Sequence, residues 1–315
     1  MVVGILGNHY NGTYDPIWEM DKHLTTINAK KGFQVGLHVD AASGGFVAPF
    51  QDDVPAWDFR LKNVLSISAS GHKFGESSCG TGWIVFRHRH DLSEHIEVEV
   101  TYLGGVSYSM TLNFSRPATG VYVQAYKFLR LGMVGYRQKV RNQLDTTKAF
   151  RDRIRSLKWN HGAPLFEICD PGDDPGLPVF AARVNPKLGL KFDNFALQRA
   201  MVQFHWYVSA YHLSFEDFGK DGANASTALC KDEEKSASMF RVVFKSNLTQ
   251  VMAEDLFHRL AEIMQHVKEV EQAEAKKELG RLNDLKDLTT FVSSGEILRI
   301  RKCRVKLFAN PHSAC

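Results

Sequence analysis

The chain has 315 residues, of which 44% are hydrophobic and 23% are charged, and its formal net charge is +4. This length is enough for two domains of ordinary size, each with its own core. No basic stripe interleaved with aromatic residues precedes the C-terminal end, so we expect no nucleic-acid partner.

Neither the N-terminus nor the cysteines indicate a secreted or membrane protein. Residues 1–7 lack a basic segment and carry a short apolar run, which predicts a strand rather than a signal peptide. A chain that begins inside a strand suggests that an upstream part of the domain is missing. No apolar run approaches the length of a membrane span. The five cysteines are scattered, without metal-ligand spacing, which indicates reduced thiols in a cytoplasmic protein.

The first predicted elements alternate between strands and a helix. Residues 15–31 place apolar side chains at helical spacing between an Asp-Pro start and a glycine stop. Strands are predicted at residues 1–7, 34–39, 64–68 and 82–86. A strand, a helix and a strand in succession imply a parallel sheet. Residues 96–102 alternate in polarity and indicate the arm of a hairpin.

The second half of the chain predicts a smaller domain. Residues 119–157 have a helical pattern with a break near residues 132–135. Strands at 179–184 and 240–244 then alternate with helices at 194–204 and 253–278, which is typical of an α/β domain. We divide the chain into a partial large domain (1–134), a C-terminal domain with its long connecting helix (135–280), and a basic, poorly ordered tail (281–315).

Residues 297–307 of the tail are basic and amphipathic. One interpretation is a target segment for calmodulin or for a membrane surface. The other is a solvated extension without a partner, and we favour it.

An aspartate and a lysine follow two neighbouring predicted strands. Asp40 comes at the end of the second strand and Lys73 comes shortly after the third. In an open parallel sheet both would project from the carboxyl edge, where ligands bind. Pyridoxal phosphate needs such a pair, because a lysine forms its Schiff base and a carboxylate pairs with its pyridinium nitrogen. The alternatives are an ordinary surface lysine and an aspartate that caps a turn.

Small and polar residues flank both positions. Ser70 and His72 can donate hydrogen bonds to a phosphate. Ala42 leaves room for a flat ring beside the backbone. Gly44 and Gly45 either serve the same close approach or form a plain turn.

Three further residues have two interpretations each. Ser115 is either a phosphate ligand or the N-cap of a helix. Arg241 lies inside an apolar strand and needs an anionic partner, which is either a substrate carboxylate or a structural one. His9 follows the first strand and either reaches the same edge of the sheet or has no role. The sequence contains no phosphate-loop glycine pattern, nucleophile elbow or metal-ligand cluster.

Five stretches of the sequence resemble the glutamate decarboxylases, which belong to the group II pyridoxal-phosphate decarboxylases. They are residues 38–46, 57–60, 66–75, 102–105 and 113–117. Gly71 stands where the aromatic amino acid decarboxylases usually carry proline, and so resembles the glutamate branch. The resemblance covers residues 6–270. It implies an α/β fold of type I, with a mostly parallel sheet in the partial large domain and a smaller C-terminal α/β domain.

The resemblance also implies roles for individual residues. The catalytic set would be Lys73, Asp40 and His72, with Lys73 as the Schiff-base lysine and Asp40 as the pyridinium partner. The other contacts would be Ala42 at the cofactor ring, Ser70 and His72 at the phosphate, Ser115 at the phosphate of the neighbouring subunit, Tyr102 on a flap over the site, Arg241 at the substrate carboxylate, and His9 in place of a family threonine that contacts cofactor or substrate.

The implied reaction converts L-glutamate to 4-aminobutanoate and carbon dioxide with pyridoxal 5′-phosphate as the cofactor. The implied assembly is a homo-oligomer, either a dimer or a hexamer. The N-terminal part of the family has no counterpart in this chain. Two alternatives therefore remain: a catalytically silent fragment that assembles with a full-length partner, and a decarboxylase of another, aromatic amino acid.

Overall fold

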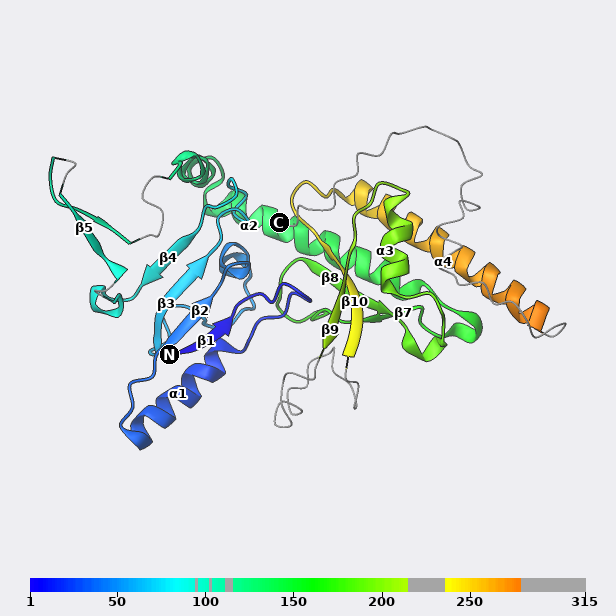
Figure 1. Cartoon of the computed structure of the whole chain (residues 1–315), viewed down its shortest axis with the longest axis horizontal. Coiled ribbons are helices and arrows are strands. Elements are labelled where there is room, and N and C mark those ends of the chain that lie inside the picture. Colours follow the sequence, from blue (N-terminus) through cyan, green and yellow to red (C-terminus); the bar gives the residue numbers. More distant parts are fainter. Residues whose placement is uncertain (94–95, 102–103, 111–115, 215–235, 279–315) are drawn as a thin grey trace.

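The computed structural model contains two four-stranded sheets joined by a long helix (Figure 1). It describes residues 1–93, 96–101, 104–110, 116–214 and 236–278. The basic tail, with its calmodulin-type segment, lies outside the described residues. Within the described ranges, no helix is both long enough and apolar enough to cross a membrane.

The first sheet has the strand order β1-β2-β3-β4. Its strands are β1 (Val2–Ile5), β2 (Leu37–Asp40), β3 (Val64–Ala69) and β4 (Trp83–Phe86). The first three strands are parallel, and β4 runs antiparallel to β3. The predicted mostly parallel sheet is confirmed. Its register aligns Ile5, Asp40 and Ser68, so the carboxyl ends of three strands meet at one edge.

Helix α1 (Ile17–Lys31) connects β1 to β2 and closes the βαβ unit. Its buried residues Ile17 and Leu24 pack in one core with Leu37 of β2. The helix ends at Gly32, whose φ of 67° is a left-handed conformation that glycine adopts without strain. The predicted helix at 15–31 therefore begins two residues later than expected and ends where expected.

A separate hairpin follows β4. It consists of β5 (Val98–Val100) and β6 (Ser107–Ser109), which pair antiparallel. The predicted hairpin arm at 96–102 is thus confirmed for its central part. Short 3-10 helices lie at Gly44–Phe46, Ala48–Phe50, Arg89–Asp91, Asn160–Gly162 and Pro186–Leu188.

Helix α2 (Thr119–Ser156) joins the two sheets and is kinked at Gly132. The φ of 56° and ψ of −171° at Gly132 are not helical, which confirms the predicted break. Before the kink, Phe128 contacts Trp83 of the first sheet, with ring centroids 6.0 Å apart. After the kink, Phe150 contacts Phe180 of the second sheet, with centroids 5.1 Å apart.

The second sheet has the order β7-β8-β10-β9 and is antiparallel throughout. Its strands are β7 (Phe166–Ile168), β8 (Val179–Val184), β9 (Ser209–Ser214) and β10 (Ser236–Val243). Helices α3 (Asn194–Val202) and α4 (Gln250–Glu278) pack against it together with the second half of α2. Phe240, Leu256 and Leu260 are fully buried in this core. The predicted strands and helices of this part are all present, whereas β7 and β9 were not predicted.

Candidate active site

Asp40 lies at the carboxyl end of β2, in the middle of the parallel strands. Its side chain is half-buried, and Oδ1 accepts hydrogen bonds from the Ala42 backbone N–H at 3.0 Å and from the Ser68 hydroxyl at 3.4 Å. Both bonds go to one oxygen. Within the described residues, Oδ2 of Asp40 therefore remains available to a ligand.

Lys73 lies in the turn that follows β3, which we call the lysine turn (residues 70–77). The turn is tied to the Asp40 segment, because the Ser70 N–H donates to the Ala42 carbonyl at 3.1 Å. Lys73 is half-buried, and its own N–H donates to the Ser70 carbonyl at 3.2 Å. The structure therefore brings Asp40, Ala42, Ser70 and Lys73 together at one edge of the sheet.

The glycines around the site are required by the packing of the chain on itself. A Cβ atom on Gly44 would lie 2.2 Å from the Leu6 carbonyl oxygen, and one on Gly45 would lie 2.7 Å from Cβ of Ala69. Real Cβ atoms do not approach so closely. Sequence reasoning offered a close approach of a cofactor or a plain turn, and the physical reason at these two positions is a close approach of other protein segments.

His72 is half-buried, and its Nδ1 lies 2.8 Å from the Thr81 carbonyl oxygen. A carbonyl only accepts hydrogen bonds, so Nδ1 carries a proton in this contact. Nε2 can then donate to an anion only when the imidazole is doubly protonated. A phosphate contact from His72 therefore requires the imidazolium form.

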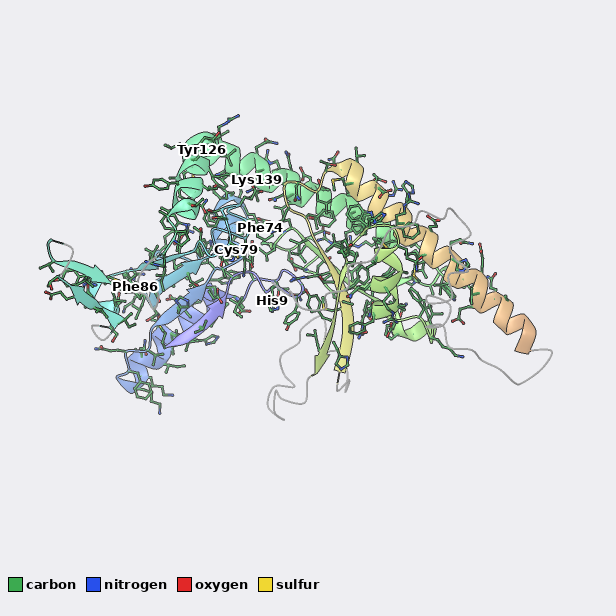
Figure 2. The ribbon with its side chains drawn as sticks, turned by 45° about the horizontal axis from the view of Figure 1, so that its top comes forward. His9, Phe74, Cys79, Phe86, Tyr126 and Lys139 are labelled. Carbon is green, nitrogen blue, oxygen red and sulfur yellow. The ribbon has the colours of Figure 1, made fainter. Side chains whose placement is uncertain are left out.

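His9 lies in the loop after β1 (residues 7–14), which crosses to the second sheet (Figure 2). In this loop the Asn11 side chain donates to the Cys169 carbonyl at 3.2 Å. Desolvation lowers the pKa of His9, and the nearby positive charges of Arg241 and Lys73 lower it further. His9, in the loop between the two sheets, is therefore close to a cation from each half of the molecule. These cations are Lys73, which follows β3, and Arg241 of β10.

Arg241 lies on β10, opposite Ser209 of β9 and Ala181 of β8. Its guanidinium carbon is 5.0 Å from the centre of the Tyr211 ring. Among the described residues, neither Arg241 nor Lys73 has a carboxylate within ion-pair distance. Two cations and an imidazole without a neutralising acid are suited to an anionic ligand.

This set of donors fits pyridoxal phosphate. The amine of Lys73 can bond to an aldehyde, the free oxygen of Asp40 can accept from a protonated ring nitrogen, and the cationic groups favour a phosphate or carboxylate. A cavity of about 530 Å³ lies elsewhere, between residues 50–53, α2 and residues 171–177, and none of the candidate residues lines it. That cavity is therefore separate from the proposed cofactor site.

Tyr102 and Ser115 lie outside the described residues. Their expected positions on a flap and at a phosphate therefore stay predictions.

Sequence reasoning missed Gln124, a fully buried residue of α2. Its Nε2 donates to the Gly75 carbonyl in the lysine turn and to the Tyr136 hydroxyl, both at 3.3 Å. Its Oε1 has no hydrogen-bond partner among the described residues. A polar residue in a helical pattern normally predicts a solvent-facing position, so the sequence carried no signal for this support of the turn.

Known proteins resemble this chain in sequence and in fold. A family model described as the pyridoxal-dependent decarboxylase conserved domain matches residues 1–181. Glutamate decarboxylase beta of Listeria innocua serovar 6a is 37% identical over 212 residues, which are 67% of this chain and 44% of that protein. Glutamate decarboxylase 5 of Arabidopsis thaliana is 32% identical over 270 residues, which are 86% of this chain and 49% of that protein.

The fold is shared with a solved structure, the glutamate decarboxylase of Lactobacillus brevis CGMCC 1306. The two align with a TM-score of 0.72 at 30% sequence identity, over 84% of this chain and 55% of that one. This confirms the expected α/β fold of the type I pyridoxal enzymes. The chain spans about half the length of these relatives. Because the family model covers more than half of the 315 residues, the chain belongs to the family of pyridoxal-dependent decarboxylases, whose cofactor is pyridoxal phosphate.

Proposed function

We propose that this chain takes part in the pyridoxal-phosphate-dependent α-decarboxylation of L-glutamate to 4-aminobutanoate and carbon dioxide. The observation that carries the proposal is the meeting of Asp40 and Lys73 at the carboxyl ends of parallel strands. Two further observations support it: the neighbouring cation Arg241 and the glutamate decarboxylases among the relatives.

When bound, pyridoxal phosphate supplies an electron-withdrawing ring that takes up the electron pair left when carbon dioxide departs. Lys73 would hold the cofactor through its amine, which can bond to the aldehyde. Asp40 keeps a proton on the ring nitrogen through its free oxygen, which maintains the ring as an electron sink. The hydrogen bonds from Ala42 and Ser68 fix the orientation of this carboxylate beforehand.

Arg241 binds a carboxylate of the substrate, because its planar guanidinium can make two parallel hydrogen bonds to it. This contact would orient the substrate relative to the cofactor, and such positioning would supply much of the rate. Ser70 and His72 hold the cofactor phosphate, and the small side chain of Ala42 lies against the ring. His9, close to both Arg241 and Lys73, contacts cofactor or substrate. Ser115 and Tyr102 complete the proposed set.

We also propose that the chain divides into domains at residues 134 and 280. We further propose that it lies in the cytoplasm and assembles into a homo-oligomer. The kink of α2 at Gly132 supports the first boundary. Cys79 is an exposed free thiol, which favours a reducing compartment. Exposed apolar side chains on β4 and the first half of α2 favour association; they include Trp83, Ile84, Val85, Val121, Tyr122 and Leu129.

The test combines absorbance with release of carbon dioxide from L-glutamate, in this chain with added pyridoxal phosphate. We expect a visible absorption band of the lysine-bound cofactor and release of carbon dioxide. Both should be lost in Lys73→Ala, because the Lys73 amine is the group that is proposed to bond to the cofactor aldehyde. Lys62→Ala is the matched control, since Lys62 is exposed and lies before β3, and it should behave as the wild type.

Absence of the band in the wild-type chain would contradict the proposal and favour a catalytically silent fragment. Faster turnover of aromatic amino acids than of glutamate would exclude the glutamate assignment.

A further inference from the structure

Glu76 lies three residues after Lys73, within the lysine turn, and its carboxylate has three partners. Lys127 Nζ is 3.0 Å from Oε2 and Lys139 Nζ is 3.1 Å from Oε1. The Ser246 hydroxyl also donates to Oε1. The side chain of Glu76 is one-fifth exposed and that of Lys139 only one-tenth, so the pair is largely shielded from water.

The three partners come from three different parts of the molecule. Lys127 lies in α2 before the kink at Gly132, and Lys139 lies in α2 after it. Ser246 follows β10, five residues after Arg241. One carboxylate therefore connects the lysine turn, both halves of the kinked helix and the strand that carries Arg241.

The backbone of the turn is held at the same point. Glu76 has a φ of 59°, and His205 is the only other non-glycine residue in the described ranges with a positive φ. A residue other than glycine persists in this conformation only when its surroundings over-determine it. Lys139 contributes to this by donating a second hydrogen bond from Nζ to the Phe74 carbonyl at 2.8 Å (Figure 2).

An apolar cluster connects the same three parts. Phe74 of the lysine turn packs with Tyr136 and Val140 of α2 and with Val243 at the end of β10. The segment between Val243 and Ser246 is short and ordered by the Lys245 N–H, which donates to the Val243 carbonyl at 3.2 Å. A displacement of Ser246 relative to Glu76 therefore moves the end of β10 relative to the lysine turn.

The charge state of Glu76 fits this role. Burial alone would raise its pKa, but the Ser246 hydroxyl and the ammonium groups of Lys139 and Lys127 outweigh burial and hold the pKa below its ordinary value. The carboxylate is therefore ionised at neutral pH. Removal of its charge would leave the shielded ammonium of Lys139 without an anionic partner, and breaking a buried ion pair by removing one charge is strongly destabilising.

We propose that Glu76 is a positioning residue that fixes the distance between the Lys73 amine and the Arg241 guanidinium. It touches neither cofactor nor substrate in this role. It acts by joining the lysine turn to the end of β10 through Ser246 and to both halves of α2 through the two lysines. The proposal rests on the proposed function, since that function assigns the substrate carboxylate to Arg241 and the cofactor to Lys73.

The experiment compares Glu76→Gln and Ser246→Ala with Asp52→Asn. Asp52 pairs with Arg137 of α2 in an exposed ion pair outside the site, so it is a matched control for the loss of a carboxylate bound to the same helix. Four quantities are measured for each variant: kcat for glutamate, KM for glutamate, the affinity for pyridoxal phosphate by visible absorbance, and backbone hydrogen exchange without ligands.

Ser246→Ala removes only the connection to β10. We expect it to raise the KM for glutamate about fivefold, with kcat and cofactor affinity nearly unchanged, because it loses one hydrogen bond to a charged group. Glu76→Gln also loosens Lys73. We expect it to lower kcat/KM about a hundredfold, since a small misplacement of reacting groups has effects of this size, and to weaken cofactor binding. Asp52→Asn should change none of these quantities.

Hydrogen exchange tests the coupling even if the chain has no activity. Glu76→Gln should accelerate exchange in the lysine turn and at the end of β10 together, whereas Asp52→Asn should accelerate neither. Faster exchange in the turn alone would overturn the proposal, as would a Ser246→Ala variant with an unchanged KM in an active chain. Failure of the wild type to bind cofactor would instead contradict the proposed function, and the exchange result would still decide the role of Glu76.

Discussion

Asp40 combines a structural and a chemical role in one side chain. Its Oδ1 accepts from the Ala42 N–H and the Ser68 hydroxyl and so forms the turn after β2. Its Oδ2 has no such partner in the described part of the chain. Because the two oxygens differ in this way, the turn and the charge of Asp40 can be separated by substitution.

Asp40→Asn keeps an oxygen that can hold the turn but removes the negative charge. We expect kcat for glutamate to fall about a thousandfold, because the substituted residue cannot stabilise a proton on the ring nitrogen. The melting temperature should stay close to that of the wild type. Asp58→Asn is the control, since Asp58 Oδ1 accepts from the Arg60 N–H at 3.0 Å in a similar turn. An Asp40→Asn variant with wild-type kcat would refute the role of the carboxylate.

At the scale of residues, the sequence predicted which side chains lie at the carboxyl ends of the strands. Asp40 and Lys73 follow apolar strands whose pattern is local, so their place at the sheet edge could be inferred. Gln124 could not be inferred in this way. Its contacts are with Gly75, 49 positions away, and with Gly71, and a helical pattern does not show which polar residue turns inward.

The kink of α2 is the feature of a single element that most affects the site. The half of α2 before Gly132 contacts the lysine turn, and the half after Gly132 contacts both the lysine turn and the second sheet. The φ of 56° and ψ of −171° at Gly132 lie in a region that is essentially open to glycine only. The angle between the two halves of α2 therefore depends on this residue.

Gly132→Ala adds a Cβ atom where space is free, since no atom lies within 4 Å of its ideal position. The cost is thus one of backbone conformation. We expect the free energy of unfolding to fall by about 1–3 kcal/mol, measured by urea denaturation. Gly105→Ala is the control, because Gly105 also has open space but no positive φ, and it should change stability little. If Gly132→Ala and Gly105→Ala lowered the free energy of unfolding equally, the backbone conformation of Gly132 would not be the cause of the loss, and this prediction would be wrong.

At the scale of elements, the second sheet shows which strands could be predicted: β8 and β10 were, and β7 and β9 were not. All six residues of β8 are buried, and their apolar run, which only Arg183 interrupts, predicted a strand at 179–184. The three residues of β7 are too few for a periodic signal. In β9, serine and histidine interrupt the apolar residues, and the strand is defined by its pairing with β10.

The molecule as a whole depends on contacts that no local pattern contains. Glu76 and Ser246 are 170 positions apart, and Asn11 and Cys169 are 158 positions apart. Both contacts join the first sheet, or its loops, to the second. The sequence predicted the two sheets, but their relative placement follows from such pairs, which form only once both halves are folded.

The free energy of unfolding of the whole chain depends on pH through Glu76. The pKa of Glu76 in the folded protein is held below its ordinary value of 4.5. The unfolded chain therefore binds a proton at Glu76 at a higher pH than the folded chain. By linkage, this residue stabilises the fold above the unfolded pKa, and the stabilisation is lost as the pH falls through the folded pKa.

Glu76→Gln should lower the free energy of unfolding at neutral pH by about 2 kcal/mol, between the values for exposed and for buried ion pairs. Below about pH 5 the difference should shrink, because the protonated wild-type residue then resembles glutamine. Urea denaturation of both proteins at a series of pH values measures this convergence. Asp52→Asn provides the comparison, since its exposed ion pair should contribute little at any pH. If the Glu76→Gln and wild-type curves ran parallel down to the lowest pH, the carboxylate of Glu76 would not hold the two halves of the molecule together.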